Sequence, residues 1–424
     1  MKSKQKKSKE PLTEKESKRK IIIRAILLGV AIIVAVIAFS IAMKSYLHKD
    51  PGYFTIDADR AEEALLYSHG VMLTCYFDGS SNEIREAMNV VRGEYSATLL
   101  RMYKLLDPVN EYEGFVNLAY LNAHLGEDVE IGLELYDILN SAYALTANGR
   151  FNMFAGALWG EWQGISVLES QADFDPLLNP DEAERIRAIS ACVGELSNFE
   201  YSIVDANAHI VRITVSEEYE TLVRELEITA PLIDLAYLKE AFELEYTADA
   251  IERAGYTNGY LVTDEGLTIA FSGAPGGTFL LHTLEKGSAV KACEVELKPS
   301  MALCESRAFP VNDLPLYYTI ESGGEQLLRH PHFDYADGAT YDALISACAV
   351  SYNGDLVSAA ADSYRLITFS DPTQAVAFCK ERAGSGAAYY FVLKAEPDTV
   401  YADADHIAQA HTDDESFAVI KPIG

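Results

Sequence analysis

Residues 21–43 form an apolar run that only Arg24 and Ser40 interrupt. A helix needs about 20 apolar residues to cross the hydrocarbon core of a bilayer, and this run is long enough. Arg24 lies about one turn from the basic end, where its long side chain can reach the headgroups. The alternative is a cleaved signal peptide, but its apolar region normally has only about 7–15 residues. The run therefore predicts one uncleaved transmembrane helix.

The charges on either side of this run predict its orientation. Residues 1–20 contain nine Lys or Arg and three Glu, and such a segment buries nothing, so we expect a solvated tail. Lysine-rich flanks stay in the cytoplasm. We therefore expect a cytoplasmic basic tail at 1–20, a transmembrane helix at 21–43, a stalk at 44–65 and a domain at 66–424 outside the cytoplasm. The predicted location is the cell membrane, crossed once.

The exported part is strongly acidic. The chain has a formal net charge of −30, but its first 50 residues carry 12 basic and 4 acidic side chains. A body with that excess of carboxylates repels phosphate backbones, so we expect no nucleic-acid partner. A hydrophobic content of 49% is too high for a disordered chain and suits one large domain or two.

The six cysteines do not point to a metal or redox motif, because none forms a CxxC pair. Cys293 and Cys304 flank what looks like a hairpin turn and could form a disulfide across it. The alternative is that all six are small buried thiols.

Hydrophobic periodicity predicts a mixed fold. Helical spacing occurs at 82–106, 129–144, 181–193, 238–254 and 374–383. The helix at 238–254 is expected to end at Gly255. Strand patterns occur at 71–77, 260–262, 268–271, 278–281, 289–297, 302–309, 346–351 and 387–393, with a hairpin at 201–215 and an edge strand near the C-terminus. This order predicts an α+β domain with largely antiparallel sheets and packed helices.

Two segments carry a more specific signal. Residues 104–122 read KLLDPVNEYEGFVNLAYLN, and residues 148–163 read NGRFNMFAGALWGEWQ. This order resembles the extracytoplasmic FAD:protein FMN transferases, the ApbE-like family. The resemblance extends to about residue 401 and implies an ApbE-like, T-fold-like architecture. It also implies FAD and Mg²⁺ as cofactors, and transfer of FMN from FAD to a Thr or Ser of a client flavoprotein.

The resemblance places a substitution at the centre of the family's site. Residues 233–245, IDLAYLKEAFELE, correspond to a signature similar to Asp-x-Gly-x-Ile-Ala-Lys-Gly-Tyr-Ala. The glycine positions become Ala236 and Tyr237, and the catalytic lysine position becomes Glu240. Lys239 is adjacent, but on a helix it would point about 100° away. A carboxylate in place of a cation that faces the phosphates of FAD turns attraction into repulsion. Each of these two interactions amounts to roughly 4 kcal/mol for unit charges about 4 Å apart at a dielectric of about 20.

The family's metal site is altered as well. Residues 357–364, VSAAADSY, correspond to a helix start whose Asp and Thr hold Mg²⁺ in such enzymes. Here those positions are Ser358 and Asp362, which face the same side of a helix. Upstream, Asp334 and Gly338 match a family loop. The resemblance thus implies Ser358 and Asp362 as candidate metal ligands, and weak Mg²⁺ binding stays open.

The resemblance also implies flavin-contacting residues, and each has a structural alternative. Tyr112, Gly114 and Asn117 would line the flavin cleft, or they are turn and cap residues. Gly156 and Trp159 would lie near the flavin, and Trp159 has core packing as its alternative.

Four more titratable residues are expected to have no function. His330 and His332 form a His-x-His pair without an obvious third ligand, so we expect surface histidines. Glu240 and Glu245 are expected on a solvated helix face rather than as acid–base catalysts.

The sequence therefore predicts a membrane-anchored relative of FMN transferases that is degenerate in its catalytic and metal residues. Two alternatives stay open: a non-catalytic flavin- or partner-binding relative, and an unrelated acidic surface-binding domain.

Overall fold

The computed structural model describes residues 28–30, 32–43, 48–58, 70–310, 316–382, 386–394, 398–411 and 418–423. The chain divides into two compact units, one made of 1–52 and 77–87 and the other of 53–76 and 88–424. The predicted basic tail, the first seven residues of the predicted membrane helix and parts of the predicted stalk lie outside the described residues.

The smaller unit contains a helix at residues 28–43, of which residue 31 is not described. Its large apolar side chains are 40–67% exposed, from Met43 at the lower value to Phe39 at the higher. Within the described ranges, no helix combines the length and the apolar character that a membrane crossing requires. In the same unit, the Lys49 amide donates to the hydroxyl of Ser81, at the start of α3 (Ser81–Leu105).

The larger unit is built on a sheet of nine strands. Pairing is antiparallel from β2 through β15, and β17 pairs in parallel with β15 at one edge. The spatial order is β1 (Gly52–Ile56), β2 (Val71–Phe77), β6 (Gly259–Thr263), β7 (Leu267–Ala270), β10 (Ala302–Arg307), β13 (Leu344–Ser351), β14 (Ala387–Leu393), β15 (Asp398–Asp403) and β17 (Ala418–Ile423). The prediction of a largely antiparallel mixed fold with a terminal edge strand is thereby confirmed.

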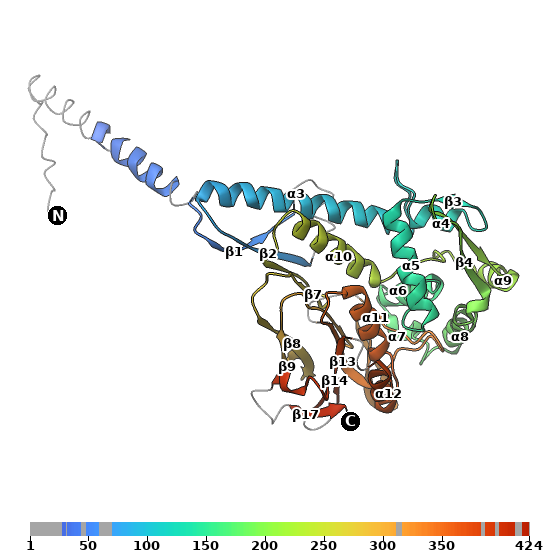
Figure 1. The fold of residues 1–424 in the computed structure, drawn as a ribbon. Helices are drawn as coiled ribbons and strands as arrows, with labels where there is room; N and C mark the ends of the chain where they lie inside the picture. The colour runs from blue at the N-terminus through green and yellow to red at the C-terminus, as the bar shows by residue number, and fades with distance from the viewer. Residues whose placement is uncertain are drawn as a thin grey trace, which may run out of the picture. The chain divides into compact units, whose positions relative to one another are not determined.

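The central strands are covered on both faces, which explains their almost continuous apolar sequence. Ala347 and Ala349 of β13 pack with α11 (Leu356–Ile367) and α12 (Pro372–Arg382), whereas Cys348 and Val350 belong to a core on the opposite face. This is the two-residue alternation of a strand with both faces buried. Figure 1 shows α11 lying along this sheet, beside α10 (Leu238–Arg253).

The opposite core is completed by a three-stranded sheet in the order β16 (Ala410–His411), β9 (Ser288–Leu297) and β8 (Gly277–Glu285). The expected hairpin between Cys293 and Cys304 is wrong, because β9 pairs with β8 and β10 pairs with β7 and β13. All six cysteines are free and buried, as the alternative predicted.

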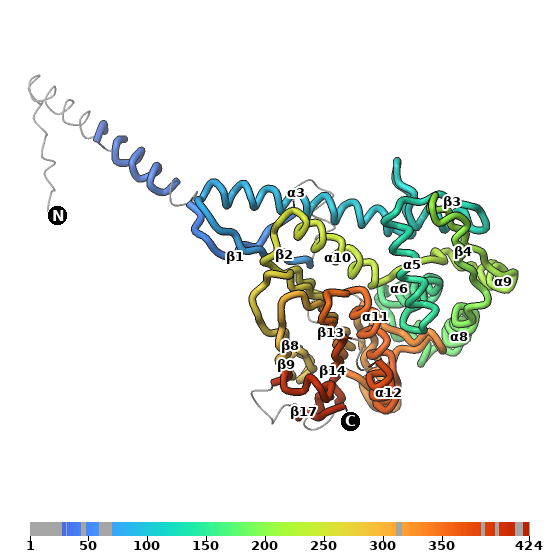
Figure 2. Tube along the Cα trace, viewed as in Figure 1, coloured from blue at the N-terminus to red at the C-terminus, as the bar shows by residue number. Residues whose placement is uncertain are grey.

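Residues 118–230 form a mainly helical region, which the green part of the tube in Figure 2 follows. It contains α4 (Leu118–Ala123), α5 (Leu133–Ala147), α6 (Gly156–Ser166), α7 (Gln171–Phe174), α8 (Pro180–Gly194), α9 (Glu217–Glu225) and a small sheet of β3 (Val129–Glu130), β5 (Ile210–Val215) and β4 (Phe199–Asp205). The predicted hairpin at 201–215 is confirmed. The helix expected from residue 129 is wrong at its start, because Val129 and Glu130 pair with β5 and Gly132 then caps α5.

Candidate functional site

A cavity of about 470 Å³ lies beside the N-terminal half of α10. Its wall includes Trp159 of α6, Tyr364 of α11, and residues of the 234–243 and 331–332 segments. Three stretches singled out in the sequence therefore meet at one place. The segment before α10 supplies Ala236, whose φ of +45° is left-handed backbone that glycine adopts more readily than alanine. The position that the resemblance aligns with a family glycine therefore has left-handed backbone here, although its residue is alanine.

The conformation of Ala236 gives a testable expectation. Ala236→Gly should raise the free energy of unfolding by up to about 1 kcal/mol, because it relieves the left-handed strain. Ala250→Gly, in the interior of α10, should instead lower it by about 1 kcal/mol. Urea unfolding of both variants measures the difference. Equal destabilisation by the two glycines would contradict the strained backbone at Ala236.

Four carboxyl groups line the cavity: Asp234, Glu240, Glu243 and Glu265. Burial is the largest cause of a raised pKa in all four, and it raises the pKa of Glu243 to about 7. The pKa of Glu240 is raised well above its ordinary value by burial and then by the charges of Glu265 and Glu243. A hydrogen bond joins Glu240 to Glu265, which has more contact with solvent than Glu240 even though its carboxyl group is partly desolvated. We assign the shared proton to Glu240, the more buried of the two.

The expectation that Glu240 and Glu245 lie on a solvated helix face is wrong. The reason is tertiary, because α10 packs against α11 and β7 and so has no broad solvated face at this point. Glu240 is half-buried in the cavity wall. Glu245 accepts the backbone amides of Leu356 and Val357 and caps α11, where the helix dipole favours a negative charge.

Lys239 also lines the cavity, so the expectation that it points away is wrong. Its Nζ lies 3.9 Å from Oε1 of Glu243 and 3.9 Å from the ring centroid of Tyr103. Among the described residues of the wall, it is the only Lys or Arg. Its charge is therefore engaged by a carboxylate and an aromatic ring of the protein itself.

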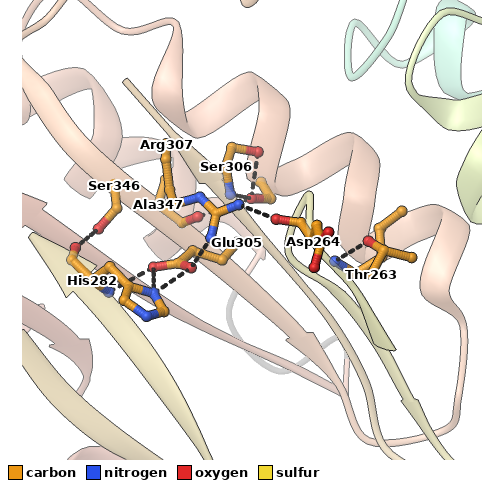
Figure 3. A network of polar contacts seen from close by, with 10 residues as sticks. Thr263, Asp264, His282, Glu305, Ser306, Arg307, Ser346 and Ala347 are labelled. Atoms are coloured by element: carbon orange, nitrogen blue, oxygen red, sulfur yellow. Dashed lines mark hydrogen bonds and ion pairs between the residues drawn. The ribbon is translucent and has the colours of Figure 1, made fainter. Parts of the chain in front are cut away.

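A second buried cation close by is also paired. Arg307 donates to Glu305 at 3.3 Å and to the backbone carbonyl of Asp264 at 2.7 Å. Figure 3 shows the Arg307 guanidinium between these two acceptors, with His282 on the other side of Glu305. Glu305 is completely buried and also accepts the amide and the Nδ1 of His282. Buried charges of opposite sign thus neutralise each other here.

The expected surface histidines are both buried. His330 donates from Nε2 to the backbone carbonyl of Tyr341 over 2.7 Å, and burial lowers its pKa to about 4. His332 is 5% exposed and lines the cavity, and burial, then the neighbouring His330 and Arg307, lowers its pKa well below the ordinary value. Both imidazoles are therefore neutral at pH 7.

The proposed metal residues lie elsewhere, in a cluster around Arg150. Asp362 is 3% exposed, and its carboxylate accepts Arg150 at 2.6 Å, Arg382 at 3.1 Å and the Tyr389 hydroxyl at 2.9 Å. Arg150 also donates to the backbone carbonyl of Ser358 at 2.8 Å. Two positively charged guanidinium groups thus contact the one carboxylate. This excess of positive charge makes the binding of a divalent cation by Asp362 electrostatically unfavourable.

The remaining sequence candidates form a turn and a close helix contact. Tyr112 donates to Asp107 at 2.7 Å, Gly114 has a φ of +81°, and Asn117 caps α4. None of the three lines the cavity among the described residues, although Pro108 and Val109 of the same loop do.

Gly156 begins α6 at a point where the backbone of residues 231–232 passes close by. A Cβ on Gly156 would lie 2.1 Å from Pro231 O, so this position needs glycine for packing. Trp159, by contrast, is 8% exposed and presents part of its ring to the cavity. The structure therefore brings together Trp159 and Glu240 but neither Gly156 nor the 112–117 turn.

Burial of these groups predicts how stability depends on pH. The raised pKa values of Glu243 and Glu245, both about 7, stabilise the fold below pH 4.5, and this contribution is lost as the pH rises through 7. The lowered pKa values of His330 and His332 act in the opposite direction up to about pH 7.5, because the unfolded histidines still bind protons there. The free energy of unfolding should therefore fall between pH 6.5 and 8, by roughly 1 kcal/mol in total. Chemical unfolding of the protein and of Glu243→Gln tests this, since the variant should show a smaller fall.

Solved structures of flavin transferases share this fold. The ApbE protein of Thermotoga maritima is 14% identical with a TM-score of 0.57, covering 86% of this chain and 100% of its own. The apo flavinyl transferase ApbE of Pseudomonas stutzeri is 14% identical, with a TM-score of 0.54 and coverage of 85% and 97%. The flavin transferase ApbE of Vibrio cholerae is 11% identical, with a TM-score of 0.56 and coverage of 85% and 99%. No protein-family profile matches the chain, and no curated protein does.

The resemblance seen in the sequence is thereby confirmed at the level of the fold: the chain is folded like the ApbE flavin transferases. The residues in the cavity do not fit the pyrophosphate of FAD. Among the described residues, four carboxyl groups line the cavity, and the one lysine of its wall is paired with Glu243. Within the described ranges, no three His, Cys, Asp or Glu side chains are grouped so that they could hold one metal ion.

Proposed function

We propose that this protein is a non-catalytic, ligand-binding relative of the flavin transferases. The observation that carries the proposal is Glu240, which the sequence resemblance aligns with the family's lysine and which shares its cavity, among the described residues, with three other carboxyl groups. Phosphoryl transfer adds negative charge to phosphate oxygens and depends on cations to stabilise it. A cavity of this charge opposes both the binding of FAD and the transfer step.

The proposal includes a location at the cell membrane, with the domain outside the cytoplasm. Residues 21–43 are apolar and follow a lysine-rich tail. The described part of this run is helical, and its large apolar side chains are exposed rather than packed against protein. Such an apolar surface is favourable when it is buried in lipid. Protease protection of the N-terminus in sealed, right-side-out membrane vesicles tests the orientation.

A residual transferase acting on a client flavoprotein is the second candidate, and Lys239 in the cavity wall favours it. The two functions are separated by incubating the full-length protein in detergent with FAD, Mg²⁺ and a threonine-containing acceptor peptide. We expect no peptide-bound flavin fluorescence, whereas an active flavin transferase in a parallel reaction labels the peptide. Labelling at a comparable rate would contradict the non-catalytic assignment.

A further inference from the structure

Two buried polar atoms of the cavity wall have no hydrogen-bond partner. They are Oε1 of Glu243, a residue that is 8% exposed and whose ion-pair contact with Lys239 at 3.9 Å is too long for a hydrogen bond, and Nδ1 of His332, which is 5% exposed. Both residues line the cavity. Leaving a buried polar group unsatisfied costs about 1–3 kcal/mol, and more for a charged group. These atoms are therefore positioned for a ligand that donates hydrogen bonds or carries positive charge.

The rest of the wall favours a cation in particular. Aromatic rings of Trp159, Tyr237 and Tyr364 lie beside the carboxyl groups, and the faces of such rings attract positive charge. The ammonium group of Lys239 already makes such contacts in the cavity wall, because it lies over the ring of Tyr103 and near the carboxyl group of Glu243. One lysine and the proton on Glu240 do not balance four carboxyl groups, so the wall can accommodate further positive charge.

We propose that the cavity binds a phosphate-free organic cation, with Glu243 and Glu240 facing its charge and Trp159 and Tyr237 contacting its apolar part. This inference rests on the proposed non-catalytic function and specifies the chemical class of its ligand. A volume of about 470 Å³ suits a small molecule rather than a macromolecule.

The same groups give the binding a defined pH dependence. The charges of Lys239 and Glu240 on α10 act on Glu243, and Asp234, Glu265 and His332 line the same cavity. A cation binds the ionised carboxylates, whose pKa values are raised in the empty cavity, so binding releases protons to the solvent. Affinity must therefore increase as the pH rises through about 7, the pKa of Glu243.

Isothermal titration of the full-length protein with benzyltrimethylammonium tests the proposal, with benzylphosphonate as the anionic counterpart. We expect saturable binding of the cation at pH 8, at least about tenfold weaker binding at pH 5.5, and no binding of the phosphonate. Repeating the titration in buffers of different ionisation enthalpy should reveal proton release. Absence of cation binding at pH 8, or tighter binding of the phosphonate, would overturn the proposal.

Matched variants locate the site. Glu243→Gln and Glu240→Gln should each weaken cation binding at least about tenfold and reduce its pH dependence. Glu184→Gln, on the exposed surface of α8, removes the same charge and should change nothing. Unchanged affinity in both cavity variants, with intact circular dichroism spectra, would also overturn the proposal. Failure of cation binding leaves the non-catalytic assignment standing, whereas FMN transfer to a peptide refutes that assignment itself.

Discussion

Asp362→Ala is expected to lower the free energy of unfolding by about 3–5 kcal/mol. Asp362 is buried and binds two guanidinium groups, from Arg150 and Arg382, together with the Tyr389 hydroxyl. Removing the carboxylate leaves these cations partly buried without their counter-charge, which costs far more than a surface ion pair contributes. Urea unfolding monitored by fluorescence measures the loss.

A nearby control separates this effect from a general loss of charge. Glu381 precedes Arg382 in α12 and is exposed, so Glu381→Ala should change the free energy of unfolding by less than about 0.5 kcal/mol. Replacing Arg150 by methionine in the Asp362→Ala background should recover part of the loss, because it removes one unpaired charge. If Asp362→Ala costs no more than Glu381→Ala, the carboxylate is not the counter-charge of the cluster.

Glu240→Lys is expected to strengthen FAD binding by at least about 100-fold. The change replaces a protonated, uncharged carboxyl group by a cation, whose attraction to the pyrophosphate amounts to roughly 4 kcal/mol at about 4 Å and a dielectric of about 20. It also puts a cation at the position where the resemblance to the transferases implies a lysine. Quenching of flavin fluorescence, measured at several salt concentrations, gives the dissociation constant.

The control for this variant is Glu184→Lys, which makes the same change of net charge outside the cavity. It should strengthen FAD binding by no more than a few fold, and added salt should abolish that gain. A gain of the same size in both variants would mean that net charge, rather than the cavity, governs FAD binding.

Much of the fold follows from the sequence because its signals are local. The strands of the large sheet are predicted by apolar runs and alternation, and α10 ends at Arg253, two residues before the predicted stop at Gly255, which has a φ of +95°. Val129 and Glu130 were misassigned because helical spacing downstream masks a two-residue bridge to β5. No local pattern distinguishes such a bridge from the first turn of a helix.

The site was less predictable, because its chemistry depends on which elements meet. The helical pattern alone predicts that Glu240 is solvated, and only the packing of α10 against α11 and β7 shows that it is half-buried. The burial of His332 and the pairing of Arg150 with Asp362 depend on contacts between distant segments. The one sequence signal for Arg150 is its place in the NGRFNMFAGALWGEWQ segment, one of the two that carry the resemblance.

Calorimetric titration of the unaltered full-length protein with FAD and Mg²⁺ at pH 8 tests most directly whether the cavity rejects phosphates. The carboxyl groups around Glu240 predict no saturable binding up to about 1 mM FAD. Saturable one-to-one binding with a micromolar dissociation constant, unaffected by Glu240→Gln, would contradict that account.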